Sequence, residues 1–267
     1  MKKVLTIAGS DSCGGAGIQA DIKTMSALGV YGMSVITAVT AQNTKGVFKV
    51  QEIDQEIIEA QIRCIFEDIQ VDAVKIGMVS EAEIIKIIKK LLIEYKAKNI
   101  VLDPVMISKS GYFLLKPEAI EELKGLISIA DVVTPNIPEA EALTDLKITS
   151  QKEMEFAALK ISKLGIKNVL IKGGHRCNDA NDVLLDEDDF VTISGYHIVT
   201  NNTHGTGCTL SSAIASYLAK GFSVKEAVTL SKEYITKAIE NSFPIGGGVG
   251  PVGHFIELYK KGSVNYE

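Results

Sequence analysis

The sequence lacks the signals of several protein classes. It has no tryptophan among its 267 residues and only four cysteines, which lie far apart at Cys13, Cys64, Cys177 and Cys208 and form no Cys-x-x-Cys pair. This spacing indicates neither a zinc site nor a disulfide framework, so we expect a reducing compartment, the cytoplasm. No run approaches the roughly twenty apolar residues that a membrane helix requires. We therefore expect a soluble protein with no membrane partner.

Charge patterns, catalytic motifs and linkers that are absent exclude further classes of protein. The net charge is −5, and the lysines are scattered without a dense basic stripe, which argues against a nucleic-acid partner. No Gly-x-Ser-x-Gly and no Gly-x-x-x-x-Gly-Lys-Ser/Thr motif occurs, which argues against an α/β hydrolase and a P-loop ATPase. No Pro-, Ser- or Gly-rich linker divides the chain, so we predict a single domain over residues 1–267.

Short apolar runs alternate with amphipathic segments along most of the chain. The runs predict strands at 4–8, 33–40, 73–77, 100–103, 132–134 and 169–171. The segments predict helices at 18–25, 55–69, 81–95, 117–127, 153–164, 209–219 and 224–241. Between 182 and 199 short alternating runs predict antiparallel edge strands, with the acidic run 186–189 at a hairpin tip. This order predicts a three-layer α/β/α sandwich with a mainly parallel central sheet.

A glycine-rich turn before the helix at 209–219 is the most specific motif. It contains Gly205, Thr206, Gly207 and Cys208, and its converging amides with the helix N-terminus suit the anion of a phosphoryl transfer. The helix dipole is expected to lower the pKa of the Cys208 thiol and to make a thiolate available as a base. The alternatives are a helix entry without a ligand and a cysteine that only packs.

A second glycine-rich turn follows the first predicted strand. Residues 8–21 read AGSDSCGGAGIQAD, a spacing that departs from Gly-x-Gly-x-x-Gly, so a dinucleotide site is a weak interpretation. The backbone can nevertheless approach a flat ligand closely here. Asp21 falls in the following helix, where its default role is a solvated surface carboxylate.

Polar residues also follow three later strands. Asp103 ends one strand, Asn136 and Glu139 follow another, and Lys172 opens Lys-Gly-Gly-His after a third. Carboxylates at strand ends can reach the water shell of Mg²⁺ and phosphates, which predicts a magnesium site at Asp103 and Glu139. The alternative for the second segment is a helix start, with Asn136 as N-cap and Glu139 as the capping-box acid.

Taken together, the motifs resemble one family along essentially the whole chain. The resemblance is carried, in order, by LTIAGSDSCGGAGIQADIKT, YGMSVITAVTAQNTKGV, VKIGMV, VLDPVM, TPNIPEAE, IKGGH and NTHGTGCTLSSAIA. These segments resemble the hydroxymethylpyrimidine and phosphomethylpyrimidine kinases of thiamine biosynthesis, within the ribokinase-like superfamily. The resemblance implies a ribokinase-like fold, the use of ATP and Mg²⁺, and a homodimer.

The resemblance also implies residue roles. It implies that the turn before the helix at 209–219 is the anion hole. Cys208 would occupy the position at which sugar kinases of the superfamily have an aspartate base. Gln42 would contact the aminopyrimidine, because an amide can donate to a ring nitrogen and accept from an exocyclic amine. Segment 106–116 resembles the flap that covers the site. The remaining implied contacts are Gly9, Asp21, Met78 and Val105 for the substrate, and Asp103, Asn136, Glu139, Lys172 and Thr203 for the nucleotide.

Three functions stay open at this point. The first is ATP-dependent phosphorylation of 4-amino-5-hydroxymethyl-2-methylpyrimidine and then of its monophosphate, giving the pyrophosphate. The second is a pyridoxal or pyridoxine kinase, because that ring is also flat, methylated and hydroxymethylated, although Gln42 favours the pyrimidine. The third is a ligand-binding protein without catalysis. Asp103, Glu139 and Lys172 argue against it, because a binder needs no phosphate machinery.

Overall fold

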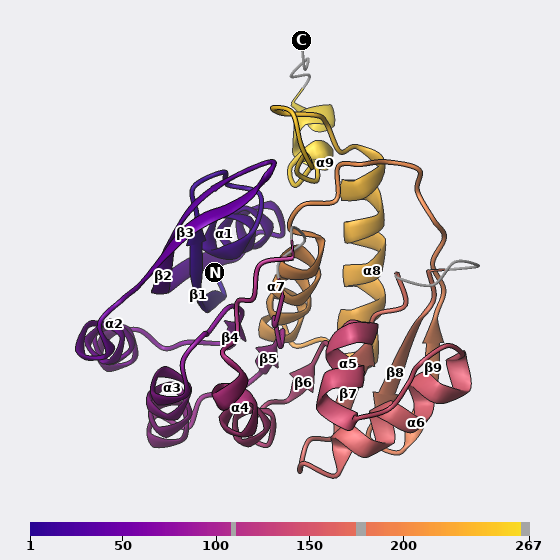
Figure 1. Cartoon of the computed structure of the whole chain (residues 1–267). Coiled ribbons are helices and arrows are strands. Elements are labelled where there is room, and N and C mark those ends of the chain that lie inside the picture. Colours follow the sequence, from indigo (N-terminus) through magenta and orange to yellow (C-terminus); the bar gives the residue numbers. More distant parts are fainter. Residues whose placement is uncertain (108–110, 175–179, 263–267) are drawn as a thin grey trace.

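A nine-stranded sheet runs through the described part of the chain, residues 1–107, 111–174 and 180–262 of this computed structural model (Figure 1). Its order is β3-β2-β1-β4-β5-β6-β7-β8-β9. The bounds are β1 (Lys3–Asp11), β2 (Tyr31–Asn43), β3 (Gly46–Glu52), β4 (Ala73–Ile76), β5 (Ile100–Leu102), β6 (Val132–Val133), β7 (Asn168–Ile171), β8 (Asp182–Asp186) and β9 (Asp189–Ile193).

Six neighbouring strands are parallel, in the order β2, β1, β4, β5, β6 and β7. The strand β3 at one edge and the strands β8 and β9 at the other edge are antiparallel. This confirms the predicted mainly parallel sheet with antiparallel edge strands. The acidic run forms the predicted hairpin tip between β8 and β9. The strand β3 was not predicted, because an edge strand with only exposed or half-buried residues lacks a continuous apolar run.

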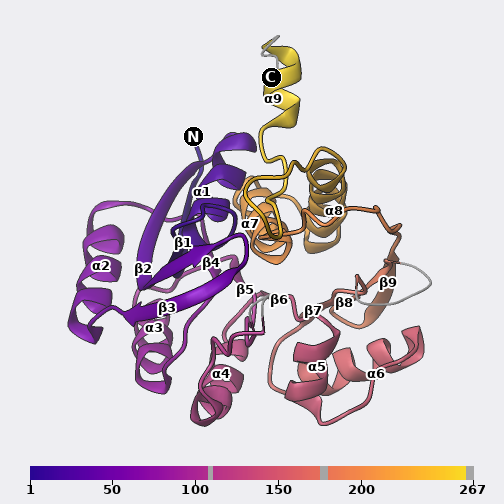
Figure 2. The same ribbon diagram turned by 45° about the horizontal axis from the view of Figure 1, so that its top comes forward.

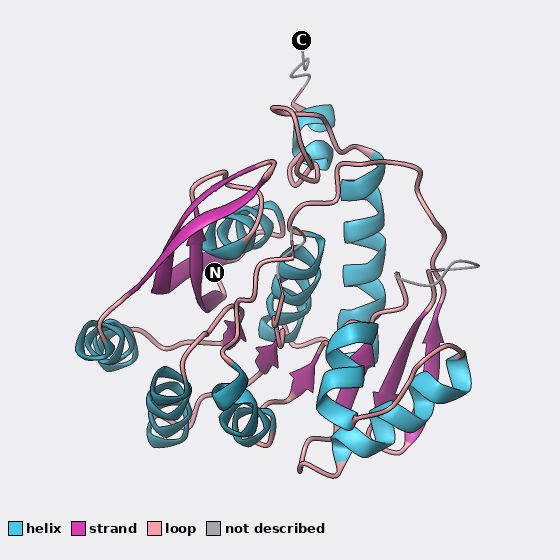
Figure 3. Cartoon of the chain, viewed as in Figure 1, coloured by secondary structure: helices cyan, strands magenta, loops and turns pink. Residues whose placement is uncertain are grey.

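Helices cover both faces of the sheet (Figure 2). On one face lie α1 (Gly17–Ala27), α7 (Thr206–Ala219) and α8 (Val224–Glu240). On the other lie α2 (Gln55–Asp68), α3 (Ala82–Glu94), α4 (Ile120–Ile127), α5 (Ile137–Thr144) and α6 (Gln151–Ser162). The short α9 (Ile256–Lys261), which was not predicted, lies near the C-terminal end (Figure 3). The predicted three-layer sandwich is therefore confirmed.

Side chains of the central strands alternate between two cores. Leu5 and Ile7 of β1 belong to the core under α2 to α6, whereas Val4 belongs to the core under α1, α7 and α8. The same alternation places Thr6 of β1 and Lys75 of β4 on the α7 side, where they are register partners. Both are fully buried, so a lysine side chain lies in the interior of the protein on the α7 side of the sheet.

Two observations bear on the class of protein. None of the helices in the described ranges is long and apolar enough to cross a bilayer. Cys13, Cys64 and Cys208 are free thiols. Cys177, His175 and residues 108–110 of the expected flap lie outside the described residues.

Candidate active site

One cavity opens where the parallel strands end. The segments that follow β1, β2, β4, β5, β6 and β7 line it, together with the turn that precedes α7. Because the carboxyl ends of parallel strands meet at one edge of a sheet, segments distant in sequence come together there. All but two of the predicted site residues line this cavity: Gly9, Gln42, Met78, Asp103, Val105, Asn136, Glu139, Lys172, Gly205, Thr206, Gly207 and Cys208.

The turn at residues 205–208 offers bare backbone to the cavity. Gly205 is the N-cap of α7 with a φ of +79°, a left-handed conformation that favours glycine. A Cβ atom there would lie 1.7 Å from the carbonyl oxygen of Gly15, so no side chain fits between the two glycine-rich turns. A Cβ atom at Gly207 would lie 3.3 Å from Asp103 Oδ2 and 3.5 Å from Lys172 Nζ. Glycine at 205 and 207 therefore keeps side chains out of this helix entry, so that an anion could reach the N-terminus of α7.

Cys208 does not have the lowered pKa that its place at a helix N-terminus predicts. Burial raises the pKa of its thiol to about 11; the ammonium of Lys75 opposes this rise, and the carboxylates of Asp21 and Asp103 add to it. Desolvation thus disfavours the thiolate. The thiol is neutral at pH 7, and the expectation of a resting thiolate is wrong.

Lys172 forms a fixed cation on the cavity wall. Its Nζ lies 2.7 Å from Oδ1 of Asp103, which follows β5 and is 2% exposed. Burial by itself lowers the pKa of Lys172, but the carboxylates of Asp103 and Glu139 outweigh it and raise that pKa. The charge is retained in a half-buried position, where an ammonium suits a phosphate oxygen.

Asn136 and Glu139 line the cavity and also begin α5. Asn136 Oδ1 accepts from the backbone nitrogen of Glu139 at 2.9 Å, and Glu139 Oε2 accepts from the backbone nitrogen of Asn136 at 2.8 Å. The capping box that the sequence offered as an alternative is therefore present. Burial raises the pKa of Glu139 to about 7, while Lys172 opposes the rise and Asp103 adds to it.

The acidic groups differ in how well they fit a hydrated Mg²⁺. Oδ1 of Asp103 accepts from Lys172 and Thr134, but its Oδ2 faces Gly207 at the edge of the cavity. Glu139 is committed to the capping box and also accepts from the backbone of Met106. Because Mg²⁺ retains several waters and needs only one or two carboxylates, Asp103 fits the ion better than Glu139 does.

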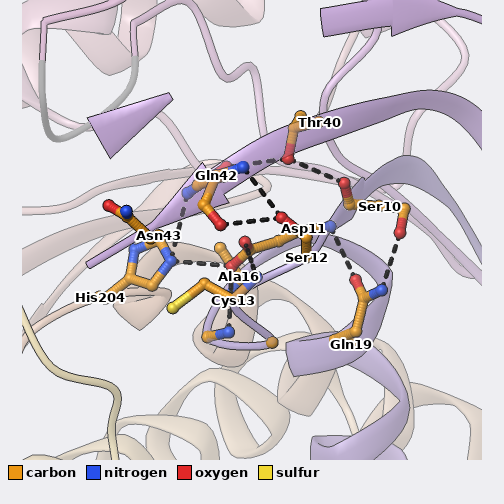
Figure 4. A network of polar contacts seen from close by, with 12 residues as sticks. Ser10, Asp11, Ser12, Cys13, Ala16, Gln19, Thr40, Gln42, Asn43 and His204 are labelled. Atoms are coloured by element: carbon orange, nitrogen blue, oxygen red, sulfur yellow. Dashed lines mark hydrogen bonds and ion pairs between the residues drawn. The ribbon is translucent and has the colours of Figure 1, made fainter. Parts of the chain in front are cut away.

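Other residues of the cavity wall suit a flat ring. Half-buried Met78 and Val105 provide apolar wall, and a Cβ atom at Gly9 would lie 3.2 Å from the sulfur of Met78. Gln42 contributes an amide at the end of β2 (Figure 4). Its Nε2 lies 3.3 Å from Nε2 of His204, and its Oε1 lies 3.2 Å from Oγ1 of Thr40.

A buried Asp11–His204 pair joins the two glycine-rich turns. Nε2 of His204 lies 2.8 Å from Oδ2 of Asp11, although the two residues are 193 positions apart. Asp11, Cys13 and His204 offer potential metal-ligand atoms within 4.8 Å of one another. Both Asp11 oxygens, however, already accept from backbone amides of the 11–16 turn, and His204 contacts one of them, so Asp11 and His204 have hydrogen-bond partners without an ion.

The comparisons with known proteins identify the family. The sequence profile described as phosphomethylpyrimidine kinase matches residues 11–253. The chain belongs to the phosphomethylpyrimidine kinase family. It is 46% identical to the hydroxymethylpyrimidine/phosphomethylpyrimidine kinase of Bacillus subtilis strain 168 over 266 residues, covering 98% of this chain and 97% of that protein. It is 49% identical to a thiamine biosynthesis bifunctional protein of Geobacter sulfurreducens, covering 95% of this chain but about half, 52%, of that longer protein.

Solved structures of two kinds share this fold. The crystal structure of phosphomethylpyrimidine kinase from Clostridium difficile 630 is 56% identical, with a TM-score of 0.81 over 90% of this chain and 100% of that one. The pyridoxal kinase of Staphylococcus aureus, solved with AMP-PCP and pyridoxal, is 36% identical, with a TM-score of 0.88 over 96% of this chain and 94% of that one. The predicted ribokinase-like kinase fold is thereby confirmed.

Asp21 does not line the cavity of this phosphomethylpyrimidine kinase family member. It is fully buried under α7, where its Oδ2 lies 2.9 Å from Nζ of Lys75 and accepts from Thr6 Oγ1 at 2.6 Å. Its Oδ1 accepts from Ser212 Oγ at 2.7 Å. Neither the predicted contact with a ligand in the cavity nor the solvated surface carboxylate fits this position, because helix α1 turns Asp21 inward onto the sheet.

Thr203 is the second predicted residue that does not line the cavity. Its carbonyl oxygen accepts from Thr206 Oγ1 at 2.7 Å, so it supports the 205–208 turn from behind. Asp11 and His204, in turn, line the cavity although the sequence predicted no role for either. Both residues lie in the glycine-rich motifs, but nothing in the sequence indicated that the turn at 11–16 contacts the turn at 205–208. The described ends of the expected flap do reach the cavity, through Ile107 and Leu114.

Proposed function

We propose that this chain transfers the γ-phosphoryl group of ATP to the hydroxymethyl group of 4-amino-5-hydroxymethyl-2-methylpyrimidine, and then to the resulting monophosphate. The product would be the pyrophosphate that thiamine assembly uses. One observation carries the proposal: a single cavity is lined by an amide and apolar side chains and also by a glycine-rich helix entry beside a lysine and an aspartate. The names of the relatives support the same chemistry.

The residues around the 205–208 turn suit a phosphoryl group that is being transferred. Phosphoryl transfer has a loose transition state, so positioning and charge stabilisation matter more than strong deprotonation of the alcohol. Amides of the 205–208 turn and the Lys172 ammonium would stabilise the charge on the phosphoryl oxygens. ATP would contribute the phosphoryl group, and Mg²⁺ would be held through its waters by Asp103, with Glu139 as the weaker candidate.

A coupled ADP-release assay with the pyrimidine and with pyridoxal tests this function. Turnover with the pyrimidine, and a product mass that shows one and then two added phosphates, would support the proposal. Turnover with pyridoxal alone would support the second candidate, which the pyridoxal-bound relative at 36% identity favours. Absence of turnover with either ring would support a binding protein.

Replacement of Gln42 by leucine is expected to weaken selectivity for the pyrimidine. Leucine keeps the approximate volume but removes a donor and an acceptor, so we expect kcat/KM for the pyrimidine relative to pyridoxal to fall about 10- to 100-fold. The nucleotide KM should stay near its normal value, because Lys172 and the 205–208 turn are unchanged. The control is Asn43→Ala, which alters a neighbouring amide on the same cavity. An unchanged ring preference in Gln42→Leu would refute the assigned role.

Replacement of Cys208 by alanine is expected to lower kcat by about tenfold, well short of the 10²–10⁴ of a positioned general base. A thiol with a pKa of about 11 is protonated at pH 7, so it can assist only weakly. Its thiolate fraction should rise about tenfold per pH unit up to that pKa, and the rate of alkylation of Cys208 should follow. Fast alkylation that no longer changes above pH 7 would contradict this assignment. A wild-type kcat in Cys208→Ala would leave the thiol a packing role.

Assembly and location remain proposals. We propose a single-domain chain that acts as a homodimer in the cytoplasm, on the basis of the family resemblance and the free thiols of the described residues. Light scattering coupled to size-exclusion chromatography gives the mass in solution. A mass near 57 kDa, about twice the 28.7 kDa of one chain, is expected, and a mass of one chain would contradict the dimer.

A further inference from the structure

Asp11 is held as a carboxylate by the turn that it closes. Its Oδ1 accepts from the backbone nitrogen of Cys13 at 2.8 Å, and its Oδ2 accepts from those of Gly15 at 3.0 Å and Ala16 at 2.8 Å. The side chain is only 3% exposed. Burial alone would raise the pKa of Asp11, but His204 and these backbone amides outweigh it and lower that pKa. Asp11 therefore presents only acceptors to its surroundings.

His204 must donate to Asp11. Its Nε2 lies 2.8 Å from Asp11 Oδ2, and because an ionised carboxylate cannot donate, the hydrogen of this contact belongs to Nε2. The ring has little freedom to move. A Cβ atom at Gly15 would lie 2.3 Å from Cδ2 of the imidazole, and the backbone nitrogen of His204 donates to the carbonyl oxygen of Gly250 at 3.0 Å. The position and the hydrogen of Nε2 are thus both fixed.

This hydrogen conflicts with the amide nitrogen of Gln42. Gln42 Nε2 lies 3.3 Å from His204 Nε2, so two N–H groups would face one another without an acceptor between them. A second conflict occurs at the other end of the same amide. The hydroxyl of Thr40 has one hydrogen, yet its Oγ1 lies 3.0 Å from the carbonyl oxygen of Ser10 and 3.2 Å from Gln42 Oε1.

A half turn of the Gln42 amide removes both conflicts. The nitrogen and oxygen ends of an amide have nearly the same shape, so the exchange needs no further space. The N–H group at Nε2 of His204 would then donate to two acceptors, Oδ2 of Asp11 and the Gln42 oxygen. The amino group would donate to Thr40 Oγ1, whose own hydrogen would go to the carbonyl oxygen of Ser10. The contact with His204 and the contact with Thr40 therefore independently favour the same orientation, with the amide oxygen toward His204.

We propose that His204, held by Asp11, fixes the Gln42 amide with its oxygen toward His204 and its amino group toward Thr40, and so determines which ring edge the cavity accepts. His204 and Asp11 are then positioning residues for substrate specificity, and they act through Gln42. In this orientation one amide N–H and one lone pair of the oxygen stay available to the ligand. They match a ring nitrogen beside an exocyclic amine, whereas a reversed amide would present the donor and the acceptor in exchanged places.

The inference rests on the proposed function for the identity of the ring, and two His204 variants test it. Phenylalanine fills the space of the imidazole without a donor, so in His204→Phe the kcat/KM ratio of pyrimidine to pyridoxal should fall about 10- to 100-fold. In His204→Gln, one nitrogen with two hydrogens can reach both Asp11 and the Gln42 oxygen. That variant should retain the ratio within about threefold.

A second buried histidine provides the matched control. His254 is 6% exposed, against 8% for His204, but it contacts Thr209 Oγ1 at 3.0 Å and does not line the cavity. His254→Asn should leave the ratio of the two rings unchanged. Thermal melting of each variant identifies any change that comes from loss of folding. An unchanged ratio in a folded His204→Phe, or an equal loss in His204→Phe and His204→Gln, would overturn the inference.

Neutron diffraction from crystals of the deuterated wild-type protein tests the orientation without any assay. Two deuterons on the Gln42 atom that faces Thr40 are expected, and one deuteron on Nε2 of His204. Deuterons on the Gln42 atom that faces His204 would overturn the inference. If the wild-type protein phosphorylates neither ring, the proposed function fails, while the neutron map still decides the amide orientation. If it phosphorylates the pyrimidine and the map shows the reverse amide, only the inference fails.

Discussion

Replacement of Gly205 by alanine should lower kcat by about 10²- to 10³-fold, the loss typical when an oxyanion donor is displaced. The methyl group would stand 1.7 Å from the carbonyl oxygen of Gly15, and the left-handed φ of +79° disfavours any side chain. The 205–208 turn must therefore move away from the turn that contains Gly15, and its amides would no longer be placed to bind a group in the cavity. Steady-state kinetics with the pyrimidine measure the loss.

The control for this variant is Gly174→Ala. Gly174 lies two residues after Lys172, but a Cβ atom there meets no atom of the described residues within 4 Å, and its φ does not lie in the left-handed region. It should keep wild-type kinetics. A Gly205→Ala variant that is folded and turns over at the wild-type rate would show that the amides of this turn do not stabilise the transferred group.

The second large effect is expected from the buried Lys75–Asp21 pair. Both side chains are 0% exposed and their charged atoms lie 2.9 Å apart. Lys75→Met leaves the Asp21 carboxylate buried without its counter-charge, so the free energy of unfolding should fall by about 3–5 kcal/mol. The double variant Asp21→Asn, Lys75→Met removes both charges and should recover much of that loss, because a buried pair contributes little net stability.

Urea unfolding followed by circular dichroism measures these changes. The control is Lys86→Met, which breaks an exposed ion pair with Glu83 at 2.7 Å and should leave the midpoint near that of the wild type. A Lys75→Met variant as stable as the wild type would show that water or a shifted proton compensates for the buried carboxylate. The same variant also removes the cation that opposes the raised pKa of Cys208, so alkylation of that thiol should become slower still.

The residues at the strand ends could be predicted from the sequence because their placement follows from a local rule. A buried apolar run predicts a strand, and a parallel sheet brings the residues after each strand to one edge. Asp103 and Lys172 reached the cavity for this reason, whereas the 205–208 turn follows no parallel strand and was predicted from its glycines before an apolar helix. The capping box at Asn136 and Glu139 was readable for a similar reason, since its partners are three residues apart.

The remaining features depend on contacts that no local pattern encodes. The partners of Asp21 come from β1, β4 and α7, so its burial follows only from the packing of three distant elements. The Asp11–His204 pair needs two glycine-rich turns to touch across 193 positions. The pKa of Cys208 was predicted with the wrong sign because helix position is visible in the sequence, whereas desolvation by the surrounding protein is not.

The central claim is that the 205–208 turn binds the phosphoryl group that is transferred. A crystal structure of the wild-type protein with a non-hydrolysable ATP analogue and the pyrimidine tests it most directly. We expect the terminal phosphate oxygens within hydrogen-bond distance of the amides of this turn, with the ring beside Gln42. A terminal phosphate bound elsewhere, with the turn facing only solvent, would contradict the account.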